Sequence, residues 1–185
     1  GEAARALSLL EEMRARGVAP DVVAFSAAIS ACEKGGEPAR ALALLDEMEA
    51  EGVPPNVISF NAALGACAAG AQPDRALALL DAMRARGLRP NARTLAAAIS
   101  ACEKARQWER ALALLKKMRA HELRPDVISF SAAISACEKG GQAELALALL
   151  ERMRAGGLEP NVITYNAAIS ACARDARWRR ALELL

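Results

Sequence analysis

Apolar and polar positions recur along this chain with a period of 35 residues, and the pattern inside each period is helical. In residues 22–34 the apolar side chains gather within a narrow arc when they are plotted at about 100° per residue. In residues 37–50 they recur at the same helical spacing. These side chains are Phe25, Ala28, Ile29 and Cys32 in the first segment and Ala41, Leu44, Leu45 and Met48 in the second. We therefore expect two amphipathic helices in each period.

Proline, glycine, asparagine and aspartate mark the ends of these helices. An Asp or Asn follows the proline of each period and precedes the apolar run, as expected of a helix N-cap. Gly35 and Gly36 break the first helix, and Gly52 ends the second before the next proline. The predicted capping residues are Asp21, Asn56, Asn91, Asp126 and Asn161.

One helix pair cannot bury its own apolar face, so neighbouring pairs must stack to form a core. The sequence therefore predicts an all-α fold, an α-solenoid of stacked antiparallel helix pairs in a single array over residues 1–185. We expect a lone second helix in residues 1–21 and a truncated repeat in residues 162–185. The full repeats between them are predicted at residues 22–56, 57–91, 92–126 and 127–161.

Charge and cysteine usage exclude several classes of function. The net charge is only +2, from 24 basic and 22 acidic residues, so any site for a polyanion must be local. The five cysteines share one slot of the repeat and form no Cys-x-x-Cys pair, which favours buried, reduced thiols over a zinc site. We find no catalytic constellation, and we expect no enzyme activity, no cofactor, no metal and no membrane segment.

The face opposite the apolar arc of the first helix carries a second repeated pattern. Its slots hold an aliphatic, a polar, a small and a basic residue, which are Val23, Ser26, Ser30 and Lys34 in the first full repeat. The same slots recur as Ile58, Asn61, Gly65 and Ala69, as Arg93, Ala96, Ser100 and Lys104, and as Ile128, Ser131, Ser135 and Lys139. An aliphatic residue beside a polar one in repeated outward positions indicates a binding surface. The alternative is the scattered apolar exposure of any solenoid.

Two segments carry a resemblance to a known family: Val-Ile-Thr-Tyr-Asn at residues 162–166 and Ala-Leu-Ala-Leu-Leu-Asp-Glu-Met at residues 41–48. Together with the period, they make the whole chain resemble pentatricopeptide repeat proteins. Tetratricopeptide repeats have a shorter period and a Trp, Gly, Tyr pattern that is absent here. The resemblance implies a right-handed superhelix that binds single-stranded RNA, one base per repeat. It also implies a role in RNA processing, stability or translation, in a mitochondrion or plastid.

By the same resemblance, the polar residue of the first helix and the residue after the end-of-repeat proline together select a base. The pairs carried over are Ser26 with Asn56, Asn61 with Asn91, Ala96 with Asp126, and Ser131 with Asn161, and Asn166 opens a further pair. The aliphatic slot sandwiches the bases through Val23, Ile58, Ile128 and Ile163, with Arg93 replacing the aliphatic residue in the third repeat. The implied target is adenine, a pyrimidine, an unspecified base and adenine.

Three alternatives stay open at this point. The Asn and Asp residues are already explained as helix caps. The basic slot can contact phosphates or complement the helix dipole, and it holds Lys34, Lys104, Lys139 and Arg174. The chain as a whole can be a protein-interaction scaffold instead of an RNA binder. In either case its exposed apolar ends can stack on further repeats or on another copy.

Overall fold

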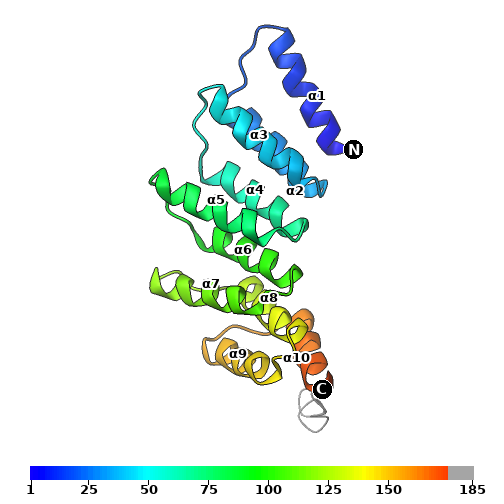
Figure 1. Cartoon of the computed structure of the whole chain (residues 1–185), viewed down its shortest axis with the longest axis vertical. Helices are drawn as coiled ribbons and strands as arrows, with labels where there is room; N and C mark the ends of the chain where they lie inside the picture. Colours follow the sequence, from blue (N-terminus) through cyan, green and yellow to red (C-terminus); the bar gives the residue numbers. More distant parts are fainter. Residues whose placement is uncertain (175–185) are drawn as a thin grey trace. The chain divides into compact units, whose positions relative to one another are not determined.

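The computed structural model describes residues 1–174, and the regular structure in them is helical throughout (Figure 1). The chain divides into two compact units, Gly1–Pro90 and a second that starts at Asn91, and each is described by itself. The first unit contains α1 (Glu2–Ala15), α2 (Val22–Lys34), α3 (Pro38–Ala50), α4 (Val57–Ala69) and α5 (Pro73–Ala85). The second contains α6 (Ala92–Lys104), α7 (Trp108–Ala120), α8 (Val127–Lys139), α9 (Ala143–Ala155) and α10 (Val162–Arg174).

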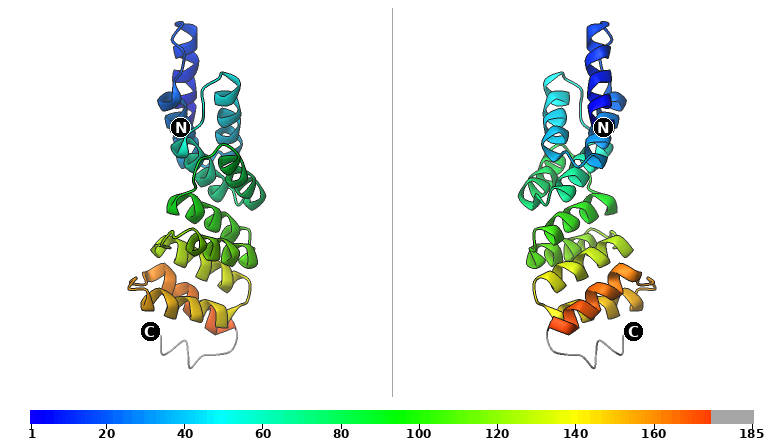
Figure 2. Two further views of the ribbon diagram at one scale, coloured as in Figure 1. Left: turned by 90° about the vertical axis from the view of Figure 1, so that its left-hand side faces the viewer. Right: turned by 90° about the vertical axis from the view of Figure 1, so that its right-hand side faces the viewer.

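In both units the first helices stack on one another and the second helices pack beside them. In the first unit α2 packs against α4, and α3 contacts both. In the second unit α8 lies between α6 and α10, and α7 and α9 pack against it (Figure 2). Helices α3, α7 and α9 therefore each contact their own first helix and the next one. The predicted all-α helical-repeat solenoid is confirmed.

The core forms where the predicted apolar arcs meet. Phe25, Ile29 and Cys32 of α2 and Met48 of α3 have no exposed surface. Full burial of such side chains stabilises each by about 1.5–3 kcal/mol, so the shared interfaces between layers hold the stack together.

The helices end close to the capping residues, glycines and prolines that mark their ends in the sequence. Helix α2 spans Val22–Lys34 as predicted, whereas α3 begins at Pro38, one residue later than expected, because Glu37 has a non-helical backbone (φ −110°, ψ 69°). Several second helices end with a glycine at positive φ, such as Gly52 at 74°. Glu122 takes the equivalent left-handed conformation at 57° after α7, where a side chain is strained.

The cysteines occupy the interior as predicted. Within the described residues all five are buried, and none forms a disulfide. Burial raises the pKa of the Cys67 and Cys137 thiols to about 11, so they are neutral at physiological pH. Across residues 1–174, no group of three or more His, Cys, Asp or Glu side chains is placed to hold a metal ion, and no helix has the length and apolar character needed to cross a membrane.

Candidate nucleic-acid interface

The aliphatic slot of the first helices points into solvent in both units. In the first unit Val23 is 68% exposed and Ile58 is 63% exposed. In the second unit Ile128 and Ile163 are each 63% exposed, and Arg93 holds the same slot and is also exposed. Burying such side chains against a ligand removes apolar surface from water, so this slot can stack on flat apolar groups such as bases.

The polar slot lies deeper than the sequence predicted. Ser26, Ala96 and Ser131 are only 7%, 6% and 6% exposed, so the expectation that this slot faces solvent is wrong for these three residues. Asn61 is half-buried and Asn166 is exposed. The position of a residue around the helix axis gives the direction of its side chain, but it does not show how far neighbouring side chains extend over it. A short side chain is therefore covered where a longer one reaches the surface.

The residues after the prolines cap the first helices as predicted. Oδ1 of Asn56 accepts hydrogen bonds from the backbone N–H groups of Ile58 (2.9 Å) and Ser59 (3.0 Å). In the second unit, Oδ1 of Asn161 accepts from the N–H of Thr164 at 3.0 Å, and Asn91 caps α6 in the same way. The predicted pair of Asn61 and Asn91 has one member in each unit.

Capping also fixes which atom of these side chains faces outward. Because Oδ1 of Asn56 and Asn161 is held by helix N–H groups, the amide nitrogen Nδ2 is the group left to offer donors. Oδ1 of Asp126 is bound to the N–H of Ser129 at 2.8 Å and to its hydroxyl at 2.7 Å, which leaves Oδ2 as an acceptor. The caps therefore present donors from Asn and an acceptor from Asp.

In the second unit, the two members of one predicted pair are joined by a third residue. Oγ of Ser131 lies 2.7 Å from Oγ1 of Thr164, and Thr164 donates to Oδ1 of Asn161 at 2.9 Å. The hydroxyl of Ser131 is therefore committed to a chain that ends on the cap. These hydrogen bonds hold the buried Ser131 close to Asn161.

The equivalent hydroxyl in the first unit is unpaired. Oγ of Ser26 is buried and has no hydrogen-bond partner among the described residues. Ser59, which corresponds to Thr164, also bonds to its own cap, where it accepts from the N–H of Asn56 at 2.9 Å, but it makes no hydrogen bond to Ser26. Two identical Ser/Asn pairs thus differ in whether the serine hydroxyl is already bound.

The basic slot is only partly available. Lys34 and Lys104 are exposed, but Nζ of Lys139 forms an ion pair with the carboxylate of Glu103 from the preceding repeat. The side chain of Arg174 lies outside the described part of the chain. Lys34 and Lys104 therefore remain the accessible candidates for phosphate contact in this slot.

Sequence reasoning missed the third residue of the first helix as part of the site. A hydroxyl residue occupies this slot in four repeats, as Ser59, Thr94, Ser129 and Thr164. A serine or threonine three residues after an Asn or Asp cap is a signal for a reciprocal cap, and it was available in the sequence. In both units this hydroxyl orients the capping side chain.

Comparison with known families and structures places these features in context. The pentatricopeptide repeat domain matches residues 8–69 and 78–142, and two further descriptions, PPR repeat family and PPR repeat, match residues 125–174 and 58–88. A search of curated proteins finds no match.

Several solved structures are similar. PPR10 from maize is 33% identical with a TM-score of 0.72, and the match covers 98% of this chain and 26% of that one. PPR10 in complex with an 18-nt psaJ RNA element is 22% identical with a TM-score of 0.80, covering 96% and 26%. The PPR domain of Arabidopsis thaliana protein-only RNase P 1, in complex with tRNA, is 20% identical with a TM-score of 0.70, covering 84% and 83%.

This chain spans about a quarter of the length of PPR10. The pentatricopeptide repeat domain nevertheless matches more than half of this chain, in two segments that together reach both units. The 35-residue period, the paired helices and the capped first helices agree with that match. The chain belongs to the pentatricopeptide repeat family.

Proposed function

We propose that this chain binds single-stranded RNA along its first helices, with each full repeat meeting one base. The observation that carries the proposal is the exposure of the aliphatic slot, 63–68% at Val23, Ile58, Ile128 and Ile163. The neighbouring caps use only Oδ1 for the helix, which leaves their second polar atom for a base. Stacking of a base on such a platform contributes about 1–3 kcal/mol per base. The family and the RNA named in the PPR10 and RNase P structures support the same interpretation.

The outward atoms of the caps account for base selection. Asn56 and Asn161 offer the donors of Nδ2, which match a ring nitrogen or carbonyl acceptor on adenine or cytosine. Asp126 offers the acceptor Oδ2, which matches the ring N–H of guanine or uracil. Ala96 has no polar group, so the third repeat selects through Asp126 alone. The expected target is adenine, a pyrimidine, a weakly specified base and adenine.

The chain acts in this proposal by occupying or remodelling its RNA site. The chemistry of RNA processing is left to other domains or partners. The family resemblance favours a mitochondrial or plastid RNA as the target.

Binding to a long unstructured RNA, measured by fluorescence anisotropy, tests the proposal. We expect tighter binding to this RNA than to a duplex of the same composition. Ile128→Ala should weaken binding by roughly five- to tenfold, from the loss of about 1 kcal/mol of stacking. Leu9→Ala is the matched control, because Leu9 is also exposed, at 56%, but lies on α1 outside the aliphatic slot.

Failure to bind any long unstructured RNA would overturn the proposal. A protein-interaction scaffold, the other function that the sequence leaves open, would bind a peptide through the same surface. It would show no preference for single strands and no response to base identity.

A further inference from the structure

The turn between a second helix and the next first helix forms a small cleft, and three of these clefts lie wholly inside one unit. We number them in chain order. The first is lined by Arg14, Gly17, Val18, Ala19, Pro20 and Glu51. The second includes Glu49, Gly52, Arg86 and Leu88, and the third includes Arg119, Glu122, Arg124, Arg152 and Gly156. The repeat makes their positions directly comparable.

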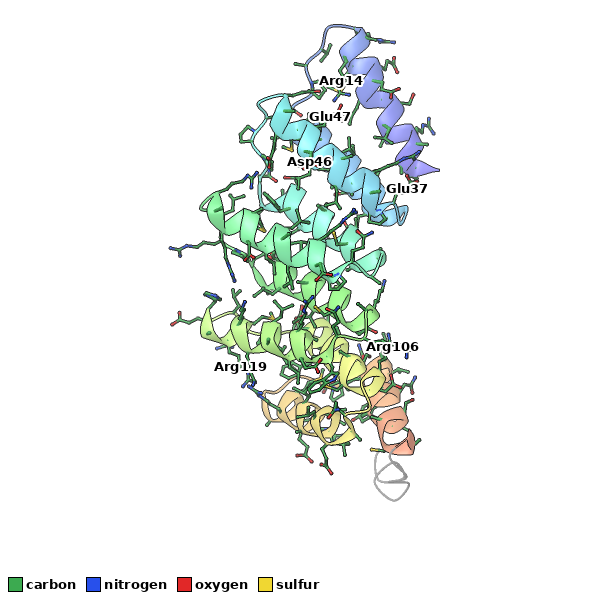
Figure 3. All side chains as sticks on the ribbon, viewed as in Figure 1. Arg14, Glu37, Asp46, Glu47, Arg106 and Arg119 are labelled. Atoms are coloured by element: carbon green, nitrogen blue, oxygen red, sulfur yellow. The ribbon has the colours of Figure 1, made fainter. Side chains whose placement is uncertain are left out.

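In the first and second clefts an ion pair between successive layers neutralises the arginine. Arg14 donates to Glu51 at 2.7 Å, and its guanidinium lies 5.8 Å from the centre of the Phe25 ring. It also forms an ion pair with Glu47 at 2.9 Å (Figure 3). In the second cleft Arg86 is paired with Glu49. In both clefts the positive charge of the arginine is therefore paired with a carboxylate.

The third cleft lacks both of the carboxylates that pair with the arginine in the first cleft. Arg119 occupies the position of Arg14, three repeats later, at the end of α7 (Figure 3). The residues that correspond to Glu47 and Glu51 are Arg152 and Gly156. Charge at this place is therefore reversed, from one cation with two anions to two cations with none.

Arg124 adds a third guanidinium to the lining, and Glu122 is the one acidic residue there. Among the described residues, no ion pair or hydrogen bond is formed by the guanidinium of Arg119, Arg124 or Arg152. The cleft has a volume of about 430 Å³, and Phe130 and Leu158 supply apolar walls. Several guanidinium groups that line one cleft beside an apolar wall can bind an anion with several acceptor oxygens.

We propose that the third cleft binds a phosphate group of the RNA backbone, which takes the place held by the Glu51 carboxylate in the first cleft. The inference rests on the proposed function. Pro125 lines the cleft and directly precedes Asp126, so the site lies within about 7 Å along the chain of the base-selecting position. In the third repeat, where Ala96 lacks a polar group, the phosphate contact supplies affinity that does not depend on sequence.

Gly156 offers a variant that closes the cleft with little disturbance. Its backbone has φ −81° and ψ 3°, and Glu51 in the first cleft has φ −79° and ψ 2°. A Cβ at Gly156 would meet only the carbonyl oxygens of Arg152 and Met153, both at 3.4 Å. Gly156→Glu therefore rebuilds the carboxylate of the first cleft opposite Arg119. Gly156→Gln is the matched control of the same shape without charge.

The test has two arms on the whole chain. In the first, inorganic pyrophosphate is titrated while the Nε–H resonance of Arg119 is followed by NMR. We expect a saturable shift in the wild type and in Gly156→Gln, and loss of the shift in Gly156→Glu. In the second arm, RNA affinity is measured across salt concentrations. The log-log salt slope should be shallower by about 0.7 in Gly156→Glu, the value for one phosphate on a single strand, and unchanged in Gly156→Gln.

The outcomes separate this inference from the proposed function. Absence of RNA binding by the wild type overturns the proposed function and this inference with it. RNA binding with equal salt slopes in all three proteins overturns the inference alone. A pyrophosphate shift without a change of salt slope assigns the cleft to a free phosphorylated ligand. It overturns the proposal that the bound phosphate belongs to RNA. If a glutamate-rich peptide shifts the Nε–H resonance of Arg119 at a lower concentration than pyrophosphate does, the proposal that the ligand is a phosphate is overturned.

Discussion

Alanine substitution at Ser26 and at Ser131 is expected to change stability in opposite directions. The two serines share one slot of the repeat and are 7% and 6% exposed. Oγ of Ser26 is buried without a partner, whereas Oγ of Ser131 lies 2.7 Å from Oγ1 of Thr164. A buried polar atom without a partner costs about 1–3 kcal/mol, and a formed hydrogen bond contributes about 0.5–1.5 kcal/mol.

Ser26→Ala removes the unpaired hydroxyl and gains slightly in helix propensity, so we expect stabilisation by about 1 kcal/mol. Ser131→Ala loses a hydrogen bond that the propensity gain only partly offsets, so we expect destabilisation by about 0.5–1 kcal/mol. The two variants should therefore differ by roughly 1–2 kcal/mol. Because a stack of repeats unfolds from its ends, native-state hydrogen exchange in α2 and α8 is a better measure than one global transition.

A double-mutant cycle isolates the cause. Thr164→Val leaves the hydroxyl of Ser131 without its partner, so Ser131→Ala in that background should become neutral or stabilising. The coupling energy between the two positions should be about 1 kcal/mol. Equal effects of alanine at Ser26 and Ser131, or zero coupling between Ser131 and Thr164, would refute the reasoning.

Two further predictions concern the packing and the thiols. Gly140→Ala should destabilise by about 1–3 kcal/mol in denaturant unfolding, because its Cβ would overlap the indole of Trp108, with Cγ at 2.8 Å. Gly156→Ala, whose Cβ would make only ordinary van der Waals contacts at 3.4 Å, should be neutral or stabilising by up to about 1 kcal/mol. The pKa of Cys67 and Cys137 is raised from 9.0 to about 11, so stability should be constant below pH 9 and fall as pH rises toward 11. Native protein should also resist thiol reagents at pH 8, and fast labelling there would contradict the burial.

The sequence predicts the helices of this fold because their ends are marked by local chemistry. An Asn or Asp cap, a glycine at the turn and a proline recur in each period, and each acts within a few residues of its own position. Helix α2 consequently has the predicted bounds, Val22–Lys34. The stacking of pairs follows because one amphipathic pair cannot bury its own apolar face.

The parts of the site that escaped prediction depend on contacts between successive layers. The helical angle of Ser131 places it on the outward face, but its burial and its bond to Thr164 are set by how closely the next first helix packs. Lys139 is likewise taken by Glu103 of the preceding layer. The open third cleft becomes visible only when the ion pair of Arg14 in the first cleft is known. These features depend on distances between layers, which local sequence patterns do not determine.

Exchange of one capping residue tests base selection most directly. Asp126 already caps its helix through Oδ1 at 2.8 Å, so Asn161→Asp should keep the cap of α10 while it replaces the outward donors by an acceptor. The measurement is selection of bound sequences from a randomised single-stranded RNA pool by the wild type and by Asn161→Asp. We predict that adenine at one position gives way to guanine or uracil, with the other positions unchanged. Continued selection of adenine at that position, or no selected sequence with either protein, would contradict the account.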